Sequence, residues 1–234
     1  MSKTKKAVII GSMLVGIGVI IGFIGIAIGG FKFPNGTVDL TTMKALHAEK
    51  KTVQIADAFD KIEIAGASSM DIEICKSKTG KNYVEYYDTD DWTSHVDVKD
   101  HVLKFTTDDK GKHKAIVSLG FGKDTRTRIY LTDAEYKEIA VTTLSGYVTI
   151  QDVNAETVNV SASSGDIDLE SCDAEKFDIT TSSGDVDMEI TAGRTYRFET
   201  KTNSGAVDVP DGDADSDYLC KIVTSSGDVD VKQK

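Results

Sequence analysis

The sequence predicts an all-β protein: a parallel β-solenoid ectodomain preceded by one N-terminal transmembrane helix. Three observations support this fold class. Residues 7–30 form an apolar run without a single charged side chain. A Ser-Gly unit recurs five times from about residue 137 onward, with glycine-to-glycine steps of 19, 19, 21 and 22 residues. Apolar and polar residues alternate on both sides of each glycine, which is the pattern of half-buried β-strands.

The apolar run is long enough to cross a membrane as a helix. At about 1.5 Å per residue it reaches about 36 Å, whereas a hydrocarbon core is about 30 Å thick. Lys3, Lys5 and Lys6 precede the run. The positive-inside rule therefore keeps residues 1–6 in the cytoplasm and places the rest of the chain outside the cell membrane. The alternative is a signal peptide cleaved near Ala27-Ile28-Gly29, but a signal core has only about 7–15 apolar residues.

Glycines in this run have the four-residue spacing that lets two membrane helices approach closely. They are Gly18, Gly22, Gly25 and Gly29. The spacing predicts a homo-oligomer through this face of the helix. Residues 31–52 follow as a juxtamembrane linker, with a turn signal at Pro34-Asn35-Gly36 and a short helix expected over 41–51.

The repeated unit predicts a strand, a turn and a second strand within an ectodomain that spans 53–234. The residues two positions after the glycines are Val148, Ile167, Val186, Val207 and Val229. One unit alone cannot bury its apolar side, but units stacked in chain order about 4.8 Å apart can do so. An antiparallel sandwich is the alternative, and the fixed period favours the solenoid.

The ectodomain before residue 137 is less regular. Ser69-Met70-Asp71-Ile72 is a degenerate copy of the unit in which methionine replaces glycine. Further strands are expected at 96–98, 102–105, 115–119 and 128–131, where apolar residues alternate or cluster. We expect these strands to form wider first coils of the same body.

These residues resemble a bacterial family labelled putative adhesin, a domain of unknown function. The resemblance rests on the Ser-Gly-Asp-Val/Ile-Asp units and on the segments 59–64, 100–105 and 129–131, and it covers about 53–234. It implies a β-solenoid protein of the cell envelope without catalytic residues. It also implies a Gram-positive bacterium, in which similar proteins with one N-terminal anchor are linked to envelope stress. Met70, Tyr147 and Ala206 depart from the repeated Gly-Asp pattern.

Stacking of the units would place aspartates in outward columns. One column holds Asp168, Asp187, Asp208 and Asp230, and a second holds Asp166, Asp185 and Asp228. Adjacent carboxylates one strand apart repel each other by about 0.8 kcal/mol in water. The first column is therefore a speculative metal site, in which Ca²⁺ would relieve the repulsion. The alternative is a solvated ladder, because calcium prefers six to eight converging oxygens.

The acidic run at 211–217 lacks the glycine position and the final glutamate of a calcium loop, so we expect it to be a solvated insertion. The net charge of −11 makes nucleic-acid binding unfavourable. The four histidines lack metal-ligand spacing, and the chain has neither a nucleophile elbow nor a phosphate loop, so we expect no enzyme and no cofactor. Cys75, Cys172 and Cys220 are expected to be free thiols, with Cys220 facing inward.

The expected function is that of a non-enzymatic, single-pass cell-surface protein that binds an envelope protein or glycan or serves a stress response. One alternative is an adhesin that binds a glycan or a host surface, and another is an enzyme acting on cell-wall polysaccharide. Only three residues follow Val231, so the last coil is expected to lack a cap. An uncapped end would allow end-to-end self-association.

Overall fold

The computed structural model describes residues 49–65, 70–88, 92–109, 126–191 and 193–234, together with the backbone of two short strands near the N-terminus. The chain divides into two units, Met1–His47 with His113–Leu119, and Ala48–Lys112 with Gly120–Lys234. In the first unit, β1 (Phe31–Phe33) and β2 (Gly36–Val38) pair antiparallel with Phe33 opposite Gly36, as expected for the turn predicted between them.

The predicted transmembrane segment at 7–30, with its four spaced glycines, lies outside the described residues. Within the described residues, no helix has the length and apolar character needed to span a bilayer. The helix expected over 41–51 is wrong at its end, because Glu49 begins a strand, β3 (Glu49–Gln54). The folded unit therefore starts inside the predicted linker rather than at residue 53.

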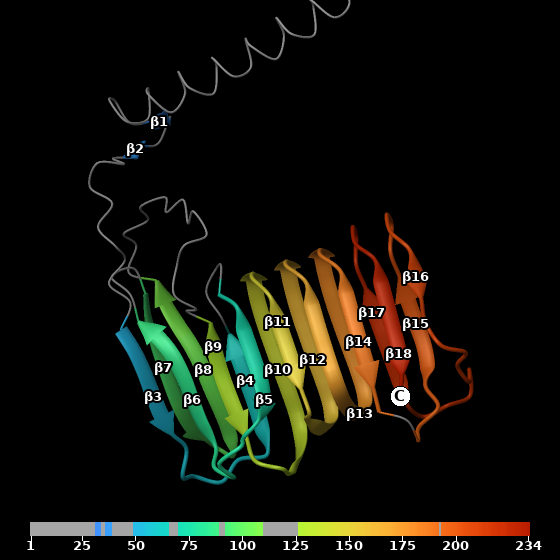
Figure 1. Cartoon of the computed structure of the whole chain (residues 1–234), viewed down its shortest axis with the longest axis horizontal. Coiled ribbons are helices and arrows are strands. Elements are labelled where there is room, and N and C mark those ends of the chain that lie inside the picture. Colours follow the sequence, from blue (N-terminus) through green and yellow to red (C-terminus); the bar gives the residue numbers. More distant parts are fainter. Residues whose placement is uncertain are drawn as a thin grey trace, which may run out of the picture. The chain divides into compact units, whose positions relative to one another are not determined.

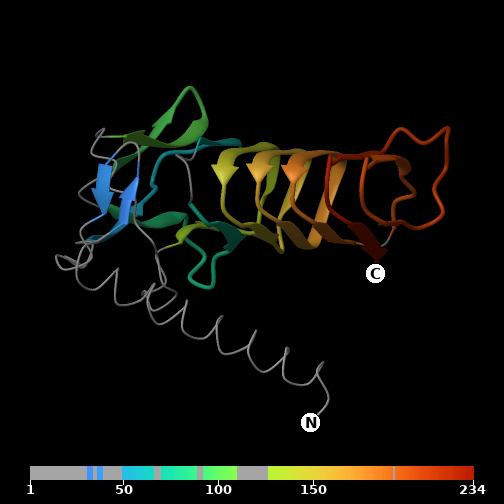
Figure 2. The same cartoon turned by 90° about the horizontal axis from the view of Figure 1, so that it is seen from above.

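The second unit is an all-β body whose strands form two walls around a common interior (Figure 1 and Figure 2). One wall contains β9 (Thr127–Leu131), β5 (Ile72–Lys76), β11 (Val148–Gln151), the start of β13 (Ile167–Ser183), β14 (Val186–Ile190), β18 (Val229–Gln233) and β16 (Val207–Asp208). The other contains β8 (Val102–Asp109), β4 (Lys61–Ala65), β10 (Glu135–Ser145), β12 (Asn154–Ser164), the end of β13, β17 (Leu219–Val223) and β15 (Arg197–Lys201).

Within both walls the neighbouring strands just named pair in parallel, with equivalent positions of successive units opposite each other. Val148 is opposite Ile167, and Ile167 is opposite Val186. On the other side of Val148 lies Ile72, so the degenerate unit at Met70 occupies the coil position that the sequence predicted. The all-β class is confirmed for the described residues, and parallel stacking in phase is confirmed for these units.

The order of the last two units differs from the prediction. Val186 is opposite Val229, and Val229 is opposite Val207, so the final coil lies between the third and fourth glycine units. Figure 1 shows β17 and β18 between β14 and the pair β15–β16. The two longest glycine-to-glycine steps occur here, because the segment between β14 and β15 carries the chain outward past one rung and residues 209–218 bring it back.

The opposite end of the walls is not a set of wider coils. There β6 (Tyr83–Asp88) pairs antiparallel with both β9 and β3, and β7 (Trp92–Lys99) pairs antiparallel with β8. The coil β8–β9 also lies outside β4–β5, although it follows it in the chain. The strand predicted at 115–119 lies outside the described residues.

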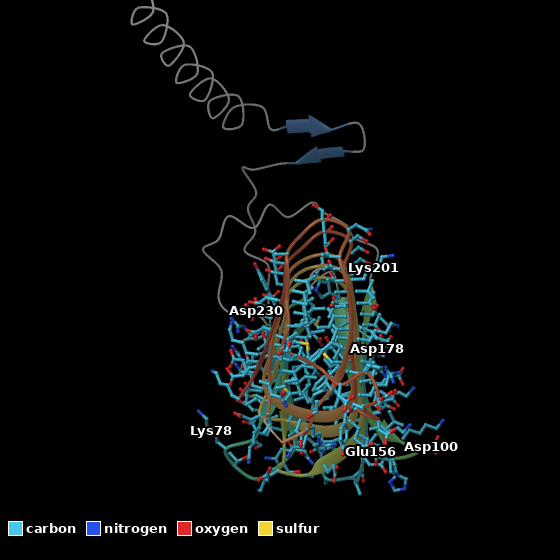
Figure 3. The ribbon with its side chains drawn as sticks, turned by 90° about the vertical axis from the view of Figure 1, so that its right-hand side faces the viewer. Lys78, Asp100, Glu156, Asp178, Lys201 and Asp230 are labelled. Carbon is cyan, nitrogen blue, oxygen red and sulfur yellow. The ribbon has the colours of Figure 1, made fainter. Side chains whose placement is uncertain are left out.

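The interior consists of the apolar columns that the alternation predicted. Figure 3, which looks along the stack, shows the two walls with side chains filling the space between them. Ile150, Leu169, Phe177 and Ile222 are fully buried members of this core. Cys172 and Cys220 are buried in it as well, and all three cysteines are free, as predicted.

Glycine is required where the coils bend from one wall to the other. Gly165 has φ of +128°, and a Cβ built on it would lie 2.1 Å from the carbonyl oxygen of Gly146. The same close approach repeats from Gly146 to Gly205, so the backbones at this bend are stacked too tightly for any side chain. Buried Thr143 donates a hydrogen bond from its hydroxyl to the carbonyl of Ser145, which helps to hold the turn.

The last coil of the chain is not the end of the stack, as the prediction assumed, and the actual end is only partly covered, because Val207 of β16 is 43% exposed. The end of the stack is formed by β15 and β16, and the acidic loop between β16 and β17 folds over its interior. Gly212 lies against the Phe198 ring, and the Asp213 N–H donates to the Tyr196 carbonyl at 3.0 Å. Tyr196 itself is fully buried, and its hydroxyl donates to the carbonyl of Ala174 at 2.6 Å. The aspartate-rich run thus covers part of the end of the stack, over Tyr196 and Phe198.

Candidate functional site

The edge at which the Ser-Gly-Asp turns stack carries a ladder of aspartates, and we call this edge the rim. It comprises the pairs Met70–Asp71, Gly146–Tyr147, Gly165–Asp166, Gly184–Asp185, Gly227–Asp228 and Gly205–Ala206, in spatial order. A rim aspartate accepts a hydrogen bond from the backbone N–H of the equivalent residue in the next coil. The bonds run from Tyr147 to Asp71 at 2.9 Å, Asp185 to Asp166 at 2.9 Å, Asp228 to Asp185 at 2.8 Å and Ala206 to Asp228 at 2.7 Å. The second predicted aspartate column is therefore structural.

The two departures from the ladder have different meanings. Ala206 stands in the coil at the end of the stack, where no further coil presents an N–H for an aspartate to accept. Tyr147 stands inside the stack, so the Asp166 N–H faces a tyrosine in place of a carboxylate acceptor. The substitution at Tyr147 is thus not explained by the architecture.

The outward side chains of β11, the start of β13, β14, β18 and β16 form what we call the aspartate face. The predicted column lies on it in the order Asp168, Asp187, Asp230 and Asp208. Glu170 and Glu189 form a second, parallel column beside Gln151. From β13 onward the outward strand positions of this face hold six carboxylates and a single cation, Lys232.

Charge on the aspartate face is only partly compensated. Lys232 pairs with Asp230 at 2.8 Å, and Lys234 pairs with Glu189 at 2.5 Å, which lowers the pKa of Glu189. Neither Asp168 nor Asp187 has an ion pair with any other described residue. Partial burial, followed by repulsion from Glu170, Asp187 and Glu189, raises the pKa of Asp168. The centre of this face therefore carries unpaired negative charge.

The arrangement does not converge on a point. Successive carboxylates follow one another by a strand spacing along a flat wall, and no group of three or more His, Cys, Asp or Glu side chains among the described residues is arranged to hold a metal ion. Calcium binding at Asp168, Asp187, Asp208 and Asp230 stays a hypothesis.

Burial raises the pKa of Cys172 and Cys220 to about 12, so neither thiol is a reactive nucleophile.

The opposite wall has a different electrostatic character. We call the outward side chains of β10, β12, the end of β13, β17 and β15 the threonine face. A shallow open groove crosses it over Thr142, Asn159, Ser161 and Thr180. Opposite charges alternate and pair on this face, as between Lys221 and Asp178 at 3.4 Å and between Arg197 and Glu199 at 3.2 Å. Figure 3 shows Asp230 on one wall and Asp178 and Lys201 on the other.

The family model of the Toastrack domain, DUF4097, matches residues 59–234. The chain belongs to the Toastrack family. No curated protein matches it. Its fold is similar to that of a putative cell adhesion protein from Clostridium sporogenes, with 18% identity, a TM-score of 0.62 and coverage of 81% of this chain and 100% of that one.

Putative adhesins from Bacteroides fragilis and Parabacteroides merdae are more distant. Each is 16% identical to this chain and matches 80% of its length. The match covers 97% of the Bacteroides fragilis chain, with a TM-score of 0.36, and 92% of the Parabacteroides merdae chain, with a TM-score of 0.33. The family assignment agrees with the resemblance that the repeated units suggested. At 18% identity the Clostridium sporogenes structure establishes a shared fold and nothing about a ligand.

The rim of this Toastrack domain also carries two residues that the sequence reasoning did not assign to a site. Leu144 and Tyr147 flank Gly146 and are 59% and 60% exposed, which makes them the most exposed large hydrophobic residues in the described part of the chain. The available signal was the departure of Tyr147 from the Gly-Asp pattern. What was missing was the knowledge that both side chains point outward.

Proposed function

We propose that this protein is a non-enzymatic binding protein of the cell envelope, whose aspartate face contacts a positively charged partner. One observation carries the proposal: the outward strand positions of that face hold six carboxylates and one lysine, and Asp168 and Asp187 at its centre have no ion pair among the described residues. Each adjacent pair costs about 0.8 kcal/mol in water. A cationic partner would remove this cost on binding, and the field would speed its approach.

The proposed setting is the outer side of a cell membrane, with residues 7–30 as the transmembrane anchor and residues 1–6 in the cytoplasm. The uncharged apolar run and the lysines before it support this topology. The stacked parallel coils, read as a β-solenoid, would serve as a rigid platform that holds the two faces at fixed spacing. Membership of the Toastrack family and the likeness to a putative cell adhesion protein agree with a binding role.

A second candidate function is binding of a glycan on the threonine face. The groove over Thr142, Asn159, Ser161 and Thr180 offers hydroxyl and amide groups that can pair with sugar hydroxyls. The described residues offer less support for hydrolysis of cell-wall polysaccharide. Glycosidases need two carboxylates that face each other across the scissile bond, whereas those of the aspartate face lie side by side along one wall.

The test uses the full-length protein in nanodiscs of zwitterionic lipid, with poly-L-lysine as a cationic probe. The first variant neutralises the aspartate face by the substitutions Asp168→Asn, Glu170→Gln, Asp187→Asn and Glu189→Gln. The control removes the same charge from the other wall by Glu63→Gln, Glu138→Gln, Asp178→Asn and Glu199→Gln. We expect the first variant to lose most of the binding and the control to retain it. Equal loss in both would show that net charge, and not the aspartate face, binds the probe.

The natural partner can then be captured in cells. A photo-crosslinking residue at Thr149, which extends the aspartate column by one coil, should trap it, and the same residue at Thr142 on the threonine face is the control. A partner that is captured from Thr142 and not from Thr149 would favour the threonine face as the binding surface.

A further inference from the structure

Leu144 and Tyr147 place two exposed large apolar side chains on the rim. At the position of Leu144 the other glycine units carry Ser163, Ser182, Asn203 and Ser225. At the position of Tyr147 they carry Asp166, Asp185, Asp228 and Ala206. Two large, exposed apolar side chains therefore lie three positions apart on one coil, before and after Gly146, where other coils carry small or acidic residues.

The surroundings of Tyr147 define the chemistry of a partner. Its backbone N–H is held by the Asp71 carboxylate at 2.9 Å, and the equivalent residue of the next coil is Asp166. Tyr147 thus occupies the ladder position between Asp71 and Asp166, whose carboxylate accepts from the Asp185 N–H of the following coil. An aromatic face attracts cations, and carboxylates form charge-assisted hydrogen bonds with ammonium and guanidinium groups. Leu144 adds apolar surface across the rim, which an aliphatic side chain or stem can cover.

We infer that Leu144 and Tyr147 are the anchor for a polypeptide segment of another protein in which apolar and basic residues alternate. This inference rests on the proposed function, because it names the partner that the acidic surface attracts. The aspartate face and the rim supply attraction at long range, and the two exposed side chains supply short-range contact and selectivity. A lipid surface fits less well, because the rim carboxylates would face the negative charge of anionic headgroups.

The repeat supplies variants that keep the fold intact. Leu144→Ser and Tyr147→Asp install residues that other coils already carry at these positions. Tyr147→Asp also provides a carboxylate where the Asp166 N–H now faces a tyrosine, so it restores the missing step of the ladder. It adds one negative charge as well. Simple charge attraction therefore predicts stronger binding of a cationic peptide by this variant, and an anchoring role for the ring predicts weaker binding.

The experiment measures affinities of the full-length protein in phosphatidylcholine nanodiscs for two heptapeptides of equal charge, one alternating lysine and leucine and one alternating lysine and serine. We expect the leucine peptide to bind at least about tenfold more tightly, and the Leu144→Ser/Tyr147→Asp variant to lose that preference. Tyr147→Phe should keep it. Empty nanodiscs give the background.

The possible outcomes separate the two proposals. If the two peptides bind equally and Tyr147→Asp strengthens both, the anchor is refuted while the acidic surface still binds cations. If neutralising the aspartate face changes the affinity for neither peptide, the proposed function is refuted, whatever the two peptides show about the anchor. Binding of the full-length protein in phosphatidylcholine nanodiscs to added phosphatidylglycerol vesicles, if Leu144→Ser/Tyr147→Asp abolishes it, would replace the peptide by a lipid surface and would also overturn the inference.

Discussion

Substitution of Gly165 by alanine probes the close stacking of the rim. Gly165 has φ of +128°, a region that side-chain-bearing residues rarely adopt, and a Cβ there would lie 2.1 Å from the Gly146 carbonyl oxygen. Carbon and oxygen atoms in contact normally stay about 3.3 Å apart. The two coils would have to separate by about 1.2 Å at this rung to accept the methyl group.

Two costs add up in the Gly165→Ala variant. Backbone strain at this φ contributes about 1–3 kcal/mol. Separation of the coils would also break the bond from the Val148 N–H to the Asp166 carbonyl, now 3.1 Å, at about 1 kcal/mol, and would loosen the packing beneath it. The expected loss is about 3–5 kcal/mol, a large part of a typical stability of about 5–15 kcal/mol.

Gly193→Ala is the matched control, because Gly193 has φ of +117° and no atom lies within 4 Å of a Cβ built on it. It carries the backbone strain without the collision. Thermal unfolding followed by circular dichroism should show a decrease in Tm of about 2–4 °C per kcal/mol, and therefore a clearly larger decrease for Gly165→Ala. Equal decreases in the two variants would refute the close stacking of the coils at the rim.

Three further predictions concern the ladder, the charge and the order of the coils. Asp185→Asn keeps a side-chain oxygen that accepts the Asp228 N–H, whereas Asp185→Ala does not, so urea unfolding should find the alanine variant less stable than the asparagine variant by about 1 kcal/mol. Asp168 has a raised pKa in the folded state, so its charge costs stability at neutral pH and that cost disappears as acid protonates it; Asp168→Asn should raise Tm at pH 7 and lose this advantage below about pH 3. In the double variant Asp187→Cys/Asp230→Cys, oxidation should form a disulfide, which mass spectrometry of tryptic peptides would detect. The double variant Asp187→Cys/Asp208→Cys should not form a disulfide, because these two positions are two rungs apart. Stacking in chain order would give the opposite pattern.

The central coils could be predicted from sequence because their signal is redundant. Two steps of 19 residues bring apolar positions, glycine and aspartate back into phase at once, and only parallel stacking satisfies all of them. The degenerate unit at Met70 was recognised for the same reason. Its apolar positions at Ile72 and Ile74 continue the columns of Val148 and Ile150, even though the glycine is missing.

The order of the last coils could not be predicted from periodicity. The columns are the same whichever copy lies above which, because Val229 and Val207 fit the same row equally well. The distinguishing information lies in single residues. Ala206 cannot offer a carboxylate to a following coil, which suits the end of the stack, and Asp228 accepts the N–H of Ala206 from the coil inside it. Gly212 allows the loop to pass closely over Phe198 and cover part of that end.

The two aspartates of each Ser-Gly-Asp-x-Asp unit have separate roles, and this separation bears on function. The first is an acceptor for the next coil, so its charge is offset by a hydrogen bond that the stack needs. The second, on the aspartate face, makes no such bond at Asp168 or Asp187, and its charge only opposes stacking. Threonine at position 149 shows that an uncharged residue fits the same row. Because folding does not require carboxylates in this row, their accumulation on one face supports a role in attracting a partner, and an Asp168→Asn/Asp187→Asn variant should fold at least as well as the parent while binding less.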